Sequence, residues 1–206
     1  GPSYDPDVVR DNEASASFIV KTVHLIATES AYPPPFMFGY WTISDLYEEI
    51  NTGQNLAYRE GNYGLLLKGD AGVPASFDLE KPAFNAFRLL HLLGDSRVAS
   101  SGGTTEDGVS LVATRADDES SVQVLVYDHV NGGTADSTSS EQVSLSVKNL
   151  PFTTVRIAVR HYVIDRDHSN SYRPWVAMGR PAAPTAEQWA ELADAGALCY
   201  FETSAK

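Results

Sequence analysis

The spacing of the apolar residues changes near residue 95, and this change constrains the fold more than any other feature of the chain. Before it, apolar residues recur at helical spacing, as in the set Ala16, Ile19, Val20, Val23, Ile26 and Ala27. After it, apolar and polar residues alternate, as in Val109, Leu111 and Ala113. Two periodicities within 206 residues predict two architectures, a helical part at 1–95 and a part built of antiparallel strands at 96–206.

The first part has the pattern of a helix, a strand, a loop and a second helix. An Asp-Pro pair at Asp5 predicts the start of a helix that continues to about residue 28, and a Lys-Pro pair opens a second helix over 81–94, which Gly94 ends. Residues 36–43 are an apolar run, which predicts a strand buried on both faces, as in a parallel sheet. Because this strand has no parallel partner in the chain, we expect upstream sequence or a companion chain to supply one.

The second part has the pattern of an antiparallel β-sandwich. Alternating apolar residues predict strands at 109–114, 143–148 and 155–163, with turn residues between them. A terminal helix is expected over 185–196, because its Thr is followed three residues later by Gln188, the spacing of a capping box.

Composition narrows the possible partners. The chain has 27 acidic and 15 basic residues, a formal net charge of -12, which argues against nucleic acid as a partner and favours neutral or cationic ligands. Its single cysteine, Cys199, excludes an intramolecular disulfide and a cysteine-based zinc site. No apolar run approaches the roughly 20 residues of a membrane-spanning helix, and no nucleotide-binding or other cofactor motif is present. We therefore expect no membrane partner, no cofactor and no metal.

The strongest candidate for a binding site follows the apolar run at 36–43. Trp41 stands at the end of that run, and three carboxylates, Asp45, Glu48 and Glu49, come just after it. A sugar needs a flat apolar surface and acceptors for its hydroxyls, so these residue types suit sugar binding. The alternative is a core strand that ends in a solvated turn.

Four motifs, in order along nearly the whole chain, resemble one known family. They are residues 40–49 (Tyr-Trp-Thr-Ile-Ser-Asp-Leu-Tyr-Glu-Glu), 81–87 (Lys-Pro-Ala-Phe-Asn-Ala-Phe), 161–170 with Trp175, and 178–188, which contains Met-Gly-Arg-Pro and Pro-Thr-Ala-Glu-Gln. With them the chain resembles the C-terminal part of glycoside hydrolase family 39, the family of β-xylosidases and α-L-iduronidase.

The resemblance implies a fold of mixed class. Residues 1–95 would be the C-terminal segment of a (β/α)8 catalytic barrel, comprising its seventh helix, eighth strand (36–43) and eighth helix. Residues 96–206 would be an appended antiparallel β-sandwich with a terminal helix. This division coincides with the change in periodicity near residue 95.

The resemblance also implies a retaining glycosidase that is β-xylosidase-like and removes terminal sugars from β-linked oligosaccharides by double displacement. In this family the acid/base glutamate follows an Asn after the fourth strand, and the nucleophile lies in a Thr-Glu-Trp-like motif after the seventh. Neither motif occurs here at the end of a predicted strand, so we expect no catalytic residue in this chain and both glutamates upstream.

By the same resemblance, Trp41, Asp45, Glu48 and Glu49 contact the substrate without reacting with it. If 45–49 is a helical turn, the three acids share one face, whereas hydrolysis requires carboxylates that flank the bond. In the following loop Arg59 begins the run Arg-Glu-Gly-Asn, where the family commonly has His-Gly-Gly. This departure leaves the sugar open, including a uronic acid as in α-L-iduronidase-like hydrolysis.

Three other hypotheses remain open. The first is that residues 96–206 form a noncatalytic carbohydrate-binding or interaction module that folds alone. The second is that the chain is a structural fragment that needs a partner to fold. His161, Asp165, Asp167 and His168 resemble metal ligands, but on this pattern they do not share one face of a strand, so hydrogen bonding is the favoured interpretation.

Overall fold

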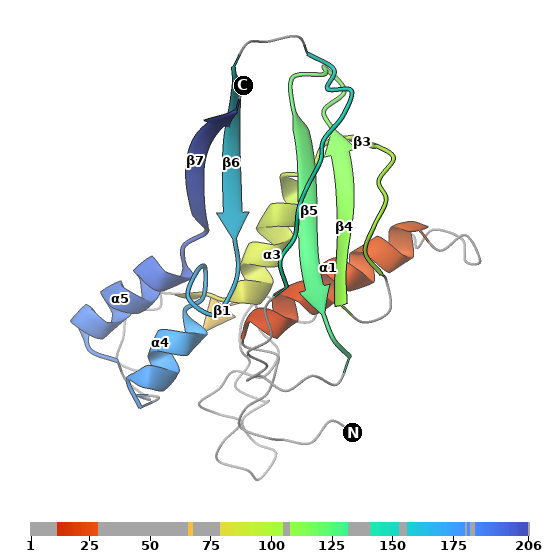
Figure 1. Ribbon diagram of the computed structural model, residues 1–206. Coiled ribbons are helices and arrows are strands. Elements are labelled where there is room, and N and C mark those ends of the chain that lie inside the picture. The colour runs from red at the N-terminus through yellow and green to blue at the C-terminus, as the bar shows by residue number, and fades with distance from the viewer. Residues whose placement is uncertain are drawn as a thin grey trace.

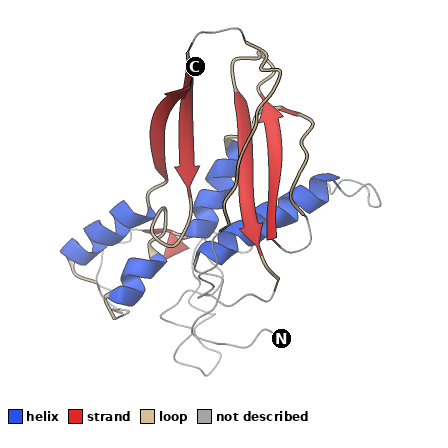
Figure 2. Ribbon diagram, in the orientation of Figure 1, coloured by secondary structure: helices blue, strands red, loops and turns tan. Residues whose placement is uncertain are grey.

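The computed structural model describes residues 12–28, 66–67, 79–104, 108–131, 141–152, 156–179, 181 and 184–205. The helices are α1 (Glu13–Thr28), α3 (Pro82–His91), α4 (Tyr172–Ala177) and α5 (Ala186–Gly196). The strands are β1 (Leu66–Leu67), β2 (Leu79–Glu80), β3 (Ser96–Arg97), β4 (Gly108–Arg115), β5 (Val122–His129), β6 (Ile157–Val163) and β7 (Cys199–Ala205). Figure 1 shows the long strands standing side by side, and Figure 2 shows the helices gathered towards one end of them.

Helix α1 begins at Glu13, because Asn12 caps it. The Asn12 Oδ1 accepts a hydrogen bond of 2.9 Å from the backbone N–H of Ala14, and asparagine is among the preferred residues for this position. The expected start at Asp5 is therefore wrong for this helix, since Asn12 is not helical. Asp5 itself lies outside the described residues. The expected end at Thr28 is confirmed.

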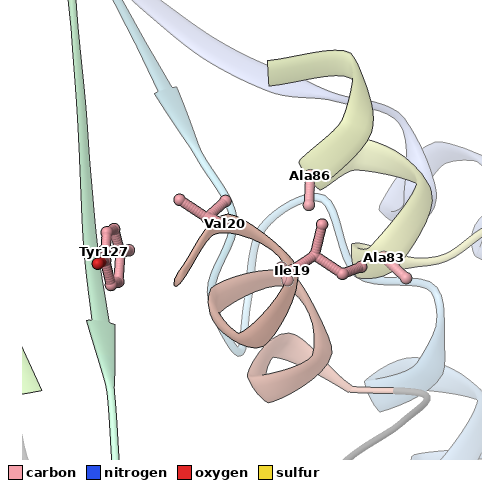
Figure 3. Packing of buried hydrophobic residues seen from close by; sticks show 6 residues of the cluster. Ile19, Val20, Ala83, Ala86 and Tyr127 are labelled. Carbon is pink, nitrogen blue, oxygen red and sulfur yellow. The ribbon is translucent and has the colours of Figure 1, made fainter. Parts of the chain in front are cut away.

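Helix α1 packs between α3 and β5. Figure 3 shows Ile19 pointing towards Ala83 and Ala86 of α3, whereas Val20 points towards Tyr127 of β5. The two alanines are fully buried, and their small side chains allow the two helices to approach closely. This first core therefore joins residues from both sides of the change in periodicity.

Helix α3 begins as predicted, with Lys81 as its N-cap and a proline in its first turn. It ends at His91, and Leu92 is its C-cap. Gly94 is therefore not the residue that ends the helix, as the sequence predicted. It lies close to β4 instead, where a Cβ on it would be 2.3 Å from the backbone carbonyl carbon of Arg115. The glycine allows the chain leaving α3 to pass against β4.

The strands form antiparallel pairs. One sheet has the order β3-β4-β5, with Leu111 opposite Val126, and β6 pairs with β7 so that Tyr162 faces Tyr200. Strand β1 pairs with β2, which the sequence did not predict. The predicted strands over 109–114 and 155–163 are confirmed as β4 and β6, except that residue 155 lies outside the described residues and β6 begins at Ile157.

The predicted strand over 143–148 is wrong for this structure. These residues form no ladder with a neighbouring strand in the described chain, and Val143, Leu145 and Val147 are about half exposed. Alternation specifies which residues share a face, but a strand also needs a partner backbone, which the pattern does not identify.

Helix α5 has the predicted capping box. The backbone N–H of Gln188 donates to Thr185 Oγ1 at 3.3 Å, and the N–H of Thr185 donates to Gln188 Oε1 at 2.9 Å. The helix is not the terminal element, however, because β7 follows it and pairs with β6. Its apolar face contributes to a second core, whose buried members are Leu79, Tyr172, Trp175, Trp189 and Leu192. Among the described helices none is both long and apolar enough to cross a membrane.

We expect His24 to make the packing of α1 on β5 sensitive to acid. Its Nδ1 lies 2.9 Å from the Tyr127 hydroxyl, and burial, followed by the charge of Arg97, lowers the pKa of His24. The unfolded chain therefore binds the proton more readily, so this contribution to stability is full above the ordinary histidine pKa and is lost as the pH falls below it.

Thermal unfolding measured between about pH 7.5 and 5.5 should show the midpoint falling with pH. The variant His24→Gln, which cannot gain the charge, should show a smaller fall. An identical pH dependence in the two proteins would contradict the assignment.

Candidate functional site

The four predicted sugar contacts, Trp41, Asp45, Glu48 and Glu49, all lie outside the described residues. The structure therefore describes the framework on either side of them. Before them in the chain lies α1, which ends at Thr28. After them come the short strand β1, then β2, which begins at Leu79, and α3, which begins at Pro82.

A buried polar junction ties α3 to the C-terminal part of the chain. The side chain of Asn85 is fully buried, and its Nδ2 donates to the carbonyl oxygens of Ser169 at 3.2 Å and Gly196 at 2.7 Å. The Ser171 hydroxyl donates to the carbonyl oxygen of Glu80 at 2.7 Å. Buried carbonyl groups require such donors, so this arrangement fixes the position of α3 relative to α4 and α5.

The start of α1 is held at the same junction. Arg173 donates from both Nε and Nη2 to the carboxylate of Glu13, the first bond being 3.1 Å long. Asn170 Nδ2 donates to the same carboxylate at 2.9 Å. Both members of the ion pair are mostly buried. Because the pair is bidentate, it fixes the orientation of α1 as well as holding its first residue close to Arg173.

The possible metal ligands take part in local hydrogen bonding. Asp165 Oδ1 accepts from the backbone N–H groups of Asp167 and His168, each at 2.8 Å, and lies 2.9 Å from His168 Nδ1. The ring of His161 lies against Phe201 instead, with ring centres 6.4 Å apart. In the described part of the chain, no three or more His, Cys, Asp or Glu residues are placed to hold a metal ion.

A hollow of about 470 Å³ opens between α3 and the antiparallel pair of β6 and β7. One wall is a face of α3 with its C-cap, and the other is a face of the β6–β7 pair and the residue before β7. The lining residues are Phe84, Phe87, Arg88, His91, Leu92, Tyr162, Leu198 and Tyr200. Tyr162 and Tyr200 face each other across the two strands, with ring centres 5.4 Å apart.

The cations around this hollow are paired with carboxylates. Arg88 Nη1 lies 2.6 Å from Glu80 Oε2, and Arg160 Nε lies 2.7 Å from Glu202 Oε1. The Glu202 carboxylate, followed by the Tyr162 hydroxyl, raises the pKa of Arg160. The Arg160 guanidinium carbon also lies 5.6 Å from the centre of the Tyr200 ring, which places a cation over an aromatic face.

Sequence reasoning identified neither the junction nor the hollow. Both bring together residues that are far apart along the chain, as with Asn85 and Gly196 or Phe84 and Tyr200. A local signal existed only for their parts: the i, i+3, i+7 spacing of Phe84, Phe87 and His91 marks one face of a helix.

Comparisons with known proteins agree with this architecture. A family model described as "Glycosyl hydrolases family 39" matches residues 1–198. A beta-xylosidase of Geobacillus stearothermophilus is 27% identical over 187 residues, which are 89% of this chain and 31% of the relative. A beta-xylosidase of Caldicellulosiruptor saccharolyticus is 27% identical over 192 residues, which are 93% of this chain and 35% of the relative. The chain thus spans about a third of the length of these relatives.

Solved structures of the same family show the same fold. The "GH39 enzyme from Xanthomonas axonopodis pv. citri" matches with a TM-score of 0.59 and 22% identity, covering 99% of this chain and 38% of that one. A "GH39 Beta-xylosidase from Caulobacter crescentus" matches with a TM-score of 0.53 and 17% identity, covering 98% of this chain and 38% of that one. On the family match over 1–198, this chain belongs to family 39 of the glycosyl hydrolases.

Proposed function

We propose that this chain is the C-terminal portion of a retaining, β-xylosidase-like glycosidase that removes terminal sugars from β-linked oligosaccharides. The observation that carries the proposal is the family match over residues 1–198, together with two beta-xylosidases of which the chain spans 31% and 35%. Its substrate is accordingly a glycoside. An α-L-iduronidase-like activity is the alternative within the family.

The proposal assigns residues 1–95 to the end of a (β/α)8 barrel and residues 96–206 to an appended β-sandwich. The close packing of α1 against α3 supports the first assignment, because neighbouring helices in such a barrel cover adjacent strands. The antiparallel pairs β4-β5 and β6-β7 support the second.

Catalysis belongs to the upstream part in this proposal. Double displacement needs an acid and a nucleophilic carboxylate about 5 to 5.5 Å apart, on opposite sides of the scissile bond. No Thr-Glu-Trp occurs in this sequence, and its Asn-Glu pair, Asn12-Glu13, opens helix α1, where the Glu13 carboxylate is bonded to Arg173. The role of this chain is to bind the sugar through Trp41, Asp45, Glu48 and Glu49 and to complete the barrel around it.

A freely folding carbohydrate-binding module at 96–206 is a weaker candidate. In the first core Val20 of α1 points towards Tyr127, and the second core contains both Leu79 and Trp189. Removing residues 1–95 would expose both sets of contacts to water, at a cost of about 25 cal/mol for each Å² of apolar surface.

Turnover of a chromogenic β-xyloside tests the location of catalysis. We expect the full-length protein, including the upstream segment, to release the chromophore and this chain alone to release none. Comparable rates for the two proteins would place the reacting carboxylates within residues 1–206 and refute the proposal.

The acids after the strand are expected to bind substrate without reacting. In the full-length protein, Glu48→Ala or Glu49→Ala should raise KM about 10- to 100-fold, because the charged acceptor for a sugar hydroxyl is lost, while kcat changes little. The exposed Glu119, which pairs with Arg115 on a turn, provides the control variant Glu119→Ala, which should keep both constants.

Two outcomes would contradict these roles. Unchanged kinetics in both Glu variants would mean that the acids are merely solvated. A loss of kcat by several orders of magnitude at constant KM would make one of them a reacting group.

A further inference from the structure

The hollow between α3 and the β6–β7 pair is lined by residues to which the proposed hydrolysis assigns no role. Its residues come from α3, from β6 and from the region of β7, and none of them belongs to the predicted sugar contacts. Its volume of about 470 Å³ lies within the range of small-molecule sites.

Aromatic rings form both walls of the hollow. Phe84 and Phe87 project from α3, while Tyr162 projects from β6 and Tyr200 from β7. Tyr200 is 49% exposed, although exposure of a large aromatic ring to water is unfavourable. Such rings offer flat apolar surfaces, and the tyrosines add hydroxyl groups at their outer ends.

Charge pairing then restricts the ligand. Arg88, which lines the hollow, and Arg160, which lies over the Tyr200 ring, are each bonded to a carboxylate, at 2.6 and 2.7 Å, so both add little net charge there. An anion would have to compete with Glu80 or Glu202 for its partner, and the formal net charge of -12 repels it further. The arrangement favours a neutral ligand.

We propose that this hollow is a secondary binding site for a short, neutral, β-linked oligosaccharide. A sugar ring combines apolar C–H faces, which pack on aromatic rings, with hydroxyl groups, which bond to Tyr162, Tyr200, His91 and Arg88. An apolar peptide would cover the two tyrosine hydroxyls and His91 without bonding to them, at a cost in free energy for each. The choice of sugar rests on the proposed function, since that function puts oligosaccharides within reach of the protein.

The chain provides a matched pair of variants. Tyr200 and Phe201 are neighbours on β7 and are 49% and 51% exposed. Their side chains point to opposite faces of the β6–β7 pair, and only Tyr200 lines the hollow. Xylotetraose is titrated into the 206-residue chain, with heat and chemical-shift changes as readouts. Tyr200→Ala should weaken binding about tenfold through loss of the ring. Tyr200→Phe, which keeps the ring and loses only the hydroxyl, should weaken it less, and Phe201→Ala should leave it unchanged.

Two further measurements separate this site from others. Trp41→Ala should leave the Tyr200-dependent binding in place, because Trp41 belongs to the proposed substrate site. Tetragalacturonate, an anionic oligosaccharide, should bind more weakly than xylotetraose. Circular dichroism confirms that each variant is folded.

The proposal is overturned if xylotetraose does not bind, if Tyr200→Ala and Phe201→Ala weaken binding equally, or if the anionic sugar binds more tightly. Binding of an apolar peptide in place of the sugar would also overturn it. Because no turnover is measured, this failure is distinct from a failure of the full-length protein to hydrolyse β-xylosides.

Discussion

The rest of the described structure depends on the side-chain amide of Asn85. It is fully buried on α3 and donates to the carbonyl oxygens of Ser169 and Gly196, which follow β6 and end α5. Each of these carbonyls would lose a hydrogen bond without the amide, and a buried group left unpaired costs about 1 to 3 kcal/mol. One side chain of the helical part therefore sets the position of two elements of the C-terminal part.

The two residues that accept hydrogen bonds from this amide are themselves tightly constrained. Ser169 has a φ of 54°, a left-handed conformation that non-glycine residues rarely adopt, and it is held there by its hydroxyl, which donates to Val163 at 2.6 Å and accepts from the N–H of Cys199 at 2.8 Å. A Cβ at Gly196 would lie 2.6 Å from the carbonyl oxygen of Glu80, so glycine is required there. These contacts hold the end of β6 and the start of β7 beside α3, and the aromatic hollow lies between the same three elements.

Local signals in the sequence predicted the local structure. The Lys-Pro start of α3, the capping box of α5 and the alternation in β4 and β6 each depend on residues close together in the chain, and each is confirmed. Three of the failures share a physical cause, which is dependence on distant partners. Residues 143–148 alternate but pair with no described strand, β7 was missed because its partner β6 lies more than thirty residues away, and Asn85 carries no sequence mark of its two acceptors. The family was recognisable from four ordered motifs, whereas the sugar contacts predicted at 41–49 lie outside the described residues and stay a prediction.

Urea unfolding of two Asn85 variants tests most directly whether this amide joins the two parts. Asn85→Ala removes the donor and should lower the free energy of unfolding by about 2 to 4 kcal/mol. Asn85→Asp keeps the shape but sets a carboxylate oxygen against the two carbonyls, so it should destabilise the protein more than alanine does. If the aspartate variant is as stable as the unmodified protein, the amide is not the donor on which the junction depends, and the account is contradicted.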